Sequence, residues 1–129
     1  MKLQDQCCTR EQGQRLIELG VKPNAAFWWM PKKNHIHGEC IRYGYHGYAI
    51  APAFNVAELG EMLPSIPAIS PKRDYAWYHR NNWRGHSVGY SHVGGEEHIE
   101  SDWYETEAQA RAALLIHLLE NKLICLQEK

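Results

Sequence analysis

The sequence predicts an α+β fold, in which an antiparallel sheet of about four or five strands carries two or three helices mainly on one face. Three segments begin with a helix-capping pattern and continue with apolar residues at helical spacing. Aromatic segments bounded by asparagine, glycine and proline lie between them, which is typical of strands joined by turns. Residues 1–129 are expected to form one domain around one core.

The first helix is expected to begin after Thr9. The side chains of Thr9 and Gln12 can each accept a hydrogen bond from the other residue's backbone N–H, which is the capping-box pattern. Gly20 suits the left-handed conformation that commonly ends a helix. The apolar stripe between them comprises Leu16, Ile17 and Leu19.

The aromatic run from Ala25 to Met30 is predicted to be a strand. The run is too short for an ordinary helix, and Pro31 closes it. The next extended region, residues 36–51, is interrupted by three glycines, so it forms either two short strands or a long connection.

A second helix is predicted from Asn55 to about Leu63. Asn55 and Glu58 repeat the capping box, and Pro64 ends the helix. The segment 65–72 carries three prolines and is expected to be a surface connection. The buried face is expected to comprise Val56, Leu59, Met62 and Leu63.

A β-hairpin is predicted for residues 75–91. Residues 75–80 and 83–91 flank Asn81 and Asn82, a pair that tolerates the backbone conformation of a tight turn. A further strand is expected within residues 98–104.

The clearest helix is predicted after Thr106, which with Gln109 forms the third capping box. This helix should be the centre of the core, so Leu115→Asp is expected to be among the most damaging substitutions. Asn121 is a suitable C-terminal cap. Its apolar positions are Ala108, Ala112, Leu115, Ile116 and Leu119.

The overall composition predicts a cytoplasmic protein. No stretch is long and apolar enough to cross a membrane, and the first residues lack the apolar segment of a signal peptide. The formal charge of −1 provides no global attraction to nucleic acid or to an anionic membrane. In a reducing compartment the cysteines are expected to be free thiols, and they are Cys7, Cys8, Cys40 and Cys125.

Three stretches of the chain resemble small proteins encoded by bacteriophages and by prophages of bacteria. They are residues 8–12 with 16–20, residues 51–59 through 63–64, and residues 105–116 through 120–124. That group has no assigned activity and no catalytic motif. The resemblance therefore implies a phage-derived protein of the bacterial host cytoplasm and implies nothing about mechanism.

The leading functional hypothesis is a non-enzymatic accessory protein that acts through protein contacts, with an unknown partner or as a homodimer. The run Phe27, Trp28, Trp29 and Met30 offers more aromatic area than one strand of a small domain easily hides, and such residues are favoured at interface centres. The alternative is that these four residues fill the core between sheet and helices.

The second hypothesis is binding of single-stranded nucleic acid through a basic and aromatic hairpin, residues 71–86. Cations could contact phosphates while aromatic rings stack on unpaired bases. The acidic segment 96–107 lies next in sequence and could oppose such binding, and the alternative is an ordinary solvated sheet face. The residues concerned are Lys72, Arg73, Tyr78, Arg80 and Arg84.

The third hypothesis is a zinc site formed by His35, His37 and Cys40. Two imidazoles would point to one face of a strand, and a bend at Gly38 would bring the thiol within reach. No paired metal-binding motif is present, so the alternative is two partly exposed histidines and a packed cysteine.

An enzymatic function is not indicated by the sequence. Cys40 or Ser87 could be combined with His86 or His92 as nucleophile and base, but no local signature joins them. Phosphate-binding and dinucleotide-binding motifs are absent, so we expect no catalytic residues and no cofactor.

Overall fold

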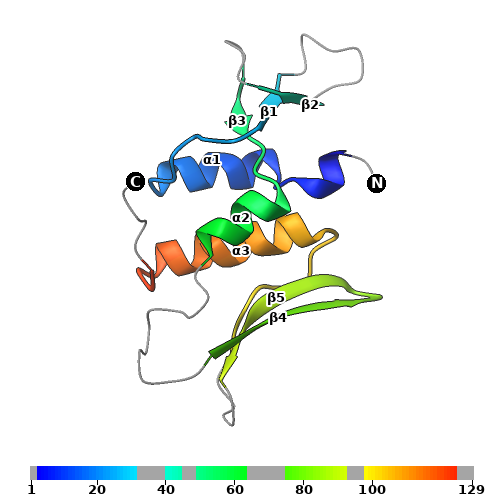
Figure 1. Ribbon diagram of the computed structural model, residues 1–129, viewed down its shortest axis with the longest axis vertical. Helices are drawn as coiled ribbons and strands as arrows, with labels where there is room; N and C mark the ends of the chain where they lie inside the picture. The colour runs from blue at the N-terminus through cyan, green and yellow to red at the C-terminus, as the bar shows by residue number, and fades with distance from the viewer. Residues whose placement is uncertain (1–2, 32–39, 45–48, 64–74, 93–97, 125–129) are drawn as a thin grey trace.

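The computed structural model describes residues 3–31, 40–44, 49–63, 75–92 and 98–124. Within these residues, the α+β class is confirmed: the helices form a middle layer between two antiparallel sheets (Figure 1). The helical elements are a 3-10 turn η1 (Leu3–Gln6), α1 (Arg10–Glu18), α2 (Val56–Met62) and α3 (Glu107–Glu120). The strands are β1 (Phe27–Met30), β2 (Cys40–Tyr43), β3 (Ala51–Pro52), β4 (Tyr75–Asn82), β5 (Gly85–His92) and β6 (His98–Glu100).

The three α-helices begin where the capping patterns predict. Thr9 and Asn55 each form a complete capping box, the first with Gln12 and the second with Glu58. At Thr106 the hydroxyl oxygen accepts a 3.1 Å hydrogen bond from the backbone N–H of Gln109, which is the first half of the box. These caps satisfy N–H groups that a helix start leaves without intrahelical partners.

Thr106→Ala is expected to lower the free energy of unfolding by about 1 kcal/mol, because α3 then loses the acceptor for an N-terminal N–H group. Urea denaturation followed by circular dichroism measures this loss. Thr106→Ser keeps the hydroxyl and should stay close to the wild-type midpoint. Equal losses in the two variants would mean that the methyl group of Thr106, and not the cap, carries the stability.

The strands form two three-stranded sheets, where the sequence predicts one sheet of four or five strands. The strand order is β2-β1-β3 in the first sheet and β4-β5-β6 in the second. Between the sheets, α3 is covered from more than one side, by β5 and by α1 and α2, and its neighbouring residues Leu114 and Leu115 are both fully buried. Adjacent helical positions point in directions about 100° apart, so a helix buried at both must be covered from more than one side.

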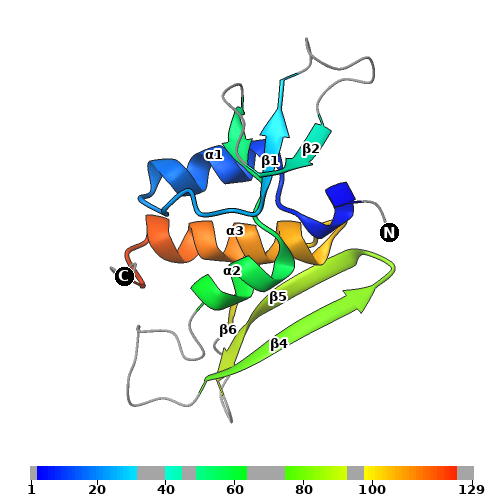
Figure 2. The same ribbon diagram turned by 45° about the horizontal axis from the view of Figure 1, so that its top comes forward.

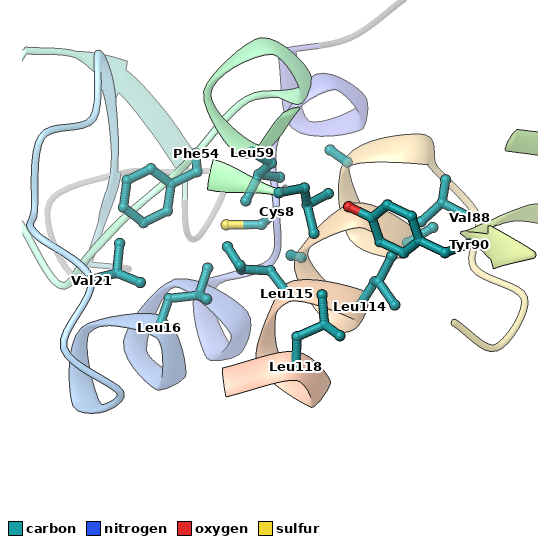
Figure 3. Packing of buried hydrophobic residues seen from close by; sticks show 14 residues of the cluster. Cys8, Leu16, Val21, Phe54, Leu59, Val88, Tyr90, Leu114, Leu115 and Leu118 are labelled. Atoms are coloured by element: carbon teal, nitrogen blue, oxygen red, sulfur yellow. The ribbon is translucent and has the colours of Figure 1, made fainter. Parts of the chain in front are cut away.

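The core lies between these layers and draws on every helix and on β5. Figure 3 shows Leu16 of α1, Leu59 of α2 and Leu115 of α3 converging on it. Figure 2 shows α2 and α3 lying side by side over β5, which contributes Val88 and Tyr90. Among the described helices, none combines the length and the apolar character needed to cross a membrane.

Candidate functional site

The β4–β5 hairpin presents one face to α3 and the other to solvent. Trp77 and Tyr90 are paired across the strands on the inner face, with ring centroids 5.3 Å apart in an edge-to-face arrangement. Tyr90 is fully buried, and burial raises its pKa to about 12. Tyr78 and Arg80 lie on the opposite face, because successive residues of a strand alternate in direction.

The outer face combines an aromatic ring, a cation and a carboxylate. The Arg80 guanidinium lies 4.8 Å from the centre of the Tyr78 ring, within the range of a cation–π interaction. The Tyr78 hydroxyl donates a hydrogen bond to the Glu100 carboxylate. Partial burial, together with that hydrogen bond, raises the pKa of Tyr78 well above its usual range, so the phenol stays protonated.

The turn end of the hairpin carries what we name the hairpin-end cluster: Trp83, Arg84 and Trp103. The Trp83 side chain is 87% exposed. The Arg84 guanidinium lies 5.1 Å from the Trp83 ring centre and 6.0 Å from that of Trp103, so it contacts both indoles. The backbone N–H of Arg84 donates to the Asn82 side chain at 2.8 Å, which holds the turn. The cluster thus presents a flat indole and a cation together.

Of this cluster only Arg84 was a predicted contact; Trp83 lies within the predicted hairpin segment 71–86, and Trp103 lies outside it. Trp103 reaches the hairpin because His86 and Tyr104 form a β-bridge, with both backbone hydrogen bonds between 2.7 and 2.8 Å. Gly85 permits the approach, since a side chain there would meet the Tyr104 carbonyl oxygen. The isolated bridge has no sequence signal, although a glycine directly after the turn is consistent with close backbone contact.

The inner face near the turn is joined to α3 by a chain of polar side chains. The His79 and His86 rings stack, with centroids 5.1 Å apart and a 2.9 Å contact between Nε2 of His79 and Nδ1 of His86. Nδ1 of His79 lies 3.4 Å from the Glu107 carboxylate. The same carboxylate forms an ion pair of 2.7 Å with the Arg111 guanidinium. This chain holds the hairpin on the N-terminal turn of α3.

The nucleophile and base combination considered for Ser87 and His86 is not assembled. Ser87 is buried, and its hydroxyl donates to the Ser101 carbonyl oxygen at 3.0 Å. Neighbouring residues of a strand point to opposite faces, so Ser87 and His86 diverge.

The thiols of Cys7 and Cys8 are free, buried and packed. Burial raises the pKa of Cys7 to about 11 and that of Cys8 to about 12. Both thiols are therefore protonated at neutral pH, and a protonated thiol is a poor nucleophile and a poor metal ligand.

The predicted interface residues lie on β1, where burial alternates. Trp28 and Met30 are buried, while Phe27 and Trp29 are half-buried. The indole N–H groups of Trp28 and Trp29 donate to the carbonyl oxygens of Ala25 and Cys8. This placement fits the alternative that the run fills the core, and the interface itself stays a prediction.

The predicted zinc ligands and two predicted nucleic-acid contacts fall largely outside the described residues. This applies to His35, His37, Lys72 and Arg73, while Cys40 is described only as the first residue of β2. In the described part of the chain, no group of three histidine, cysteine or acidic residues could hold a metal ion. The zinc hypothesis therefore stays a prediction.

Comparison of the chain with protein-family models, with curated proteins and with solved structures finds no match. No activity of a relative therefore bears on the hairpin-end cluster.

Proposed function

We propose that this chain is a non-enzymatic accessory protein of phage or prophage type, acting in the bacterial cytoplasm, and that its hairpin-end cluster binds single-stranded nucleic acid. The carrying observation is Trp83, which leaves 87% of its side chain in solvent beside a guanidinium. An exposed indole is a platform on which an unpaired base can stack, and the adjacent arginine can contact a phosphate.

The second arginine of the hairpin supports a nucleic-acid ligand. Arg80 is exposed and stacks on Tyr78, so a cation and a ring recur along the outer face of β4. A single strand presents phosphates and bases in alternation, which this arrangement matches. Base stacking also needs no sequence-specific hydrogen bonds, so a surface with only a few exposed rings and cations is sufficient for it.

The acidic side chains of the same face suggest the path of the strand. Glu100 and Asp102 lie in or just beyond β6, on the far side of β5 from β4. Glu100 is already engaged by the Tyr78 hydroxyl. Phosphates are repelled by carboxylates, so we place the backbone of the bound strand beside Arg84 at the turn end of the hairpin and away from Glu100.

Fluorescence anisotropy with labelled oligothymidine and oligoadenosine at low salt tests this proposal. Trp83→Ala should weaken binding roughly tenfold, because it removes one stacking contact worth about 1–3 kcal/mol. The double variant Arg80→Gln with Arg84→Gln should weaken binding and also reduce its dependence on salt.

Arg15→Gln is the matched control. Arg15 is also a partly exposed arginine, but it lies on α1, across α3 from the hairpin (Figure 1). Wild-type protein that binds neither oligonucleotide at low salt would refute the proposal. Equal weakening by Arg15→Gln would show that the binding is not located at the hairpin end.

A further inference from the structure

Two hollows on the surface of the described residues adjoin one another. The first, of about 380 Å³, lies among η1, β1 and the start of α2. The second, of about 430 Å³, lies among η1, β5 and the start of α3. Gln6 and Val56 line both hollows, so the two share a wall, and we call the pair the groove. Each volume is within the range of sites that take a side chain or a small ligand.

One end of the groove is apolar. Its walls are Leu3, Phe27 and Ala57, which come from three different elements. The Phe27 ring meets the Tyr43 ring edge to face at 5.7 Å, and 77% of the Tyr43 side chain is exposed. Aromatic and aliphatic surface that remains open in this way is typical of a contact site for an apolar side chain.

The other end is acidic. It is lined by Asp5, Glu105 and Glu107, with His86 beside them. The Glu107 carboxylate forms a 2.7 Å ion pair with Arg111, which neutralises its charge. Asp5 and Glu105 are exposed and have no ion pair within the described part of the chain. The end therefore keeps two carboxylates available for a cation.

We propose that the groove binds a short segment of a partner protein that carries a lysine or arginine side chain close to a large apolar side chain. The cation would lie between Asp5 and Glu105, and the apolar side chain would cover Phe27 and Ala57. Charge complementarity favours this occupant and excludes a polyanion, because phosphates would meet the same carboxylates. The groove and the hairpin-end cluster therefore take ligands of opposite charge.

Selection from a library of random peptides on immobilised full-length protein tests the inference. Enriched peptides should combine a basic residue with a large apolar residue. A synthetic copy of the strongest peptide should bind about tenfold more weakly to Asp5→Asn with Glu105→Gln, and also to Ala57→Glu. Replacing the basic residue of the peptide by glutamate should abolish binding.

The fold of each variant is checked by thermal unfolding, and Gln14→Glu on α1 is the matched surface control, since Gln14 is exposed and outside the groove. Absence of enrichment, enrichment of peptides without a basic residue, or binding unchanged in both groove variants would overturn the inference. Oligonucleotide anisotropy is measured on the same variants and should not be weakened, since they keep Trp83 and Arg84 and only remove carboxylates or add one at Ala57. Failure of the groove and failure of the hairpin end are therefore separate results.

Discussion

Leu115→Asp is expected to leave the chain without a cooperative fold. Leu115 is fully buried in α3 and belongs to the core cluster that the described residues form. Removing a buried leucine side chain costs about 2–5 kcal/mol, and burying an unpaired carboxylate adds several more. A domain of this size has a total stability of roughly 5–15 kcal/mol, so the substitution removes most or all of it.

Circular dichroism during heating checks this expectation, since the variant should lack a cooperative transition. Leu115→Ala should remain folded but melt at a lower temperature, because it leaves a cavity and no charge. Gln14→Asp adds the same carboxylate at an exposed position of α1 and should cost less than about 1 kcal/mol. A cooperative Leu115→Asp variant with near-wild-type stability would contradict the layered core described above.

Gly13→Ala is expected to destabilise the protein even though alanine is the better helix former. Gly13 lies in α1 where the helix crosses β3, and an added Cβ would stand 2.1 Å from the Pro52 carbonyl oxygen. The atom in the way belongs to the backbone, so α1 must move off the strand. Overpacking of this kind costs about 1–3 kcal/mol or more, against a gain of about 1 kcal/mol in helix propensity.

Gly60→Ala is the matched comparison within another helix. Its added Cβ would meet the Arg111 guanidinium nitrogen at 2.5 Å, and that group is the end of a flexible side chain. Arg111 can shift, so Gly60→Ala should be neutral or stabilising by up to about 1 kcal/mol. Urea denaturation of the two variants measures the difference. A Gly13→Ala protein more stable than the wild type would mean that α1 does not rest on β3.

The helices were predictable because their determinants are local. Thr9, Asn55 and Thr106 each place a hydrogen-bond acceptor within three residues of the N–H group that needs it. The apolar stripe of α3 was predicted only in part, since Leu114 and Leu118 are also fully buried. A one-sided stripe is the expectation for a helix that covers one sheet, whereas α3 packs in the middle of the molecule.

The division into two sheets could not be read from the sequence. Strand pairing depends on contacts between residues far apart in the chain, such as Trp28 with both Arg42 and Pro52. No local preference distinguishes that arrangement from a pairing of β1 with the hairpin. Phe54 was missed for a similar reason, because the residue before the N-cap of α2 becomes fully buried only through tertiary packing.

The turn of the hairpin was predicted wrongly at Asn81 and Asn82, which belong to β4, because the structure turns at Trp83 and Arg84. The candidate site was predictable where it depends on alternation within one hairpin. The separation of Trp77 from Tyr78 and Arg80 follows from the two-residue period of a strand. The contribution of Trp103 was not predictable, because it depends on the β-bridge between His86 and Tyr104. The groove was also hidden, since Phe27 lines one hollow while Asp5 and Glu105 line the other, and these residues from distant parts of the chain come together only in the folded protein.

The position of α3 in the middle layer also bears on biosynthesis. Every other described element precedes α3 in the chain, so the ribosome has translated both sheets before Glu107 is added. Until then Leu16, Leu59 and Val88 lack the helix that they pack against in the finished core. The nascent polypeptide therefore exposes apolar surface of the kind that chaperones recognise, and it completes its core after translation has passed Glu120.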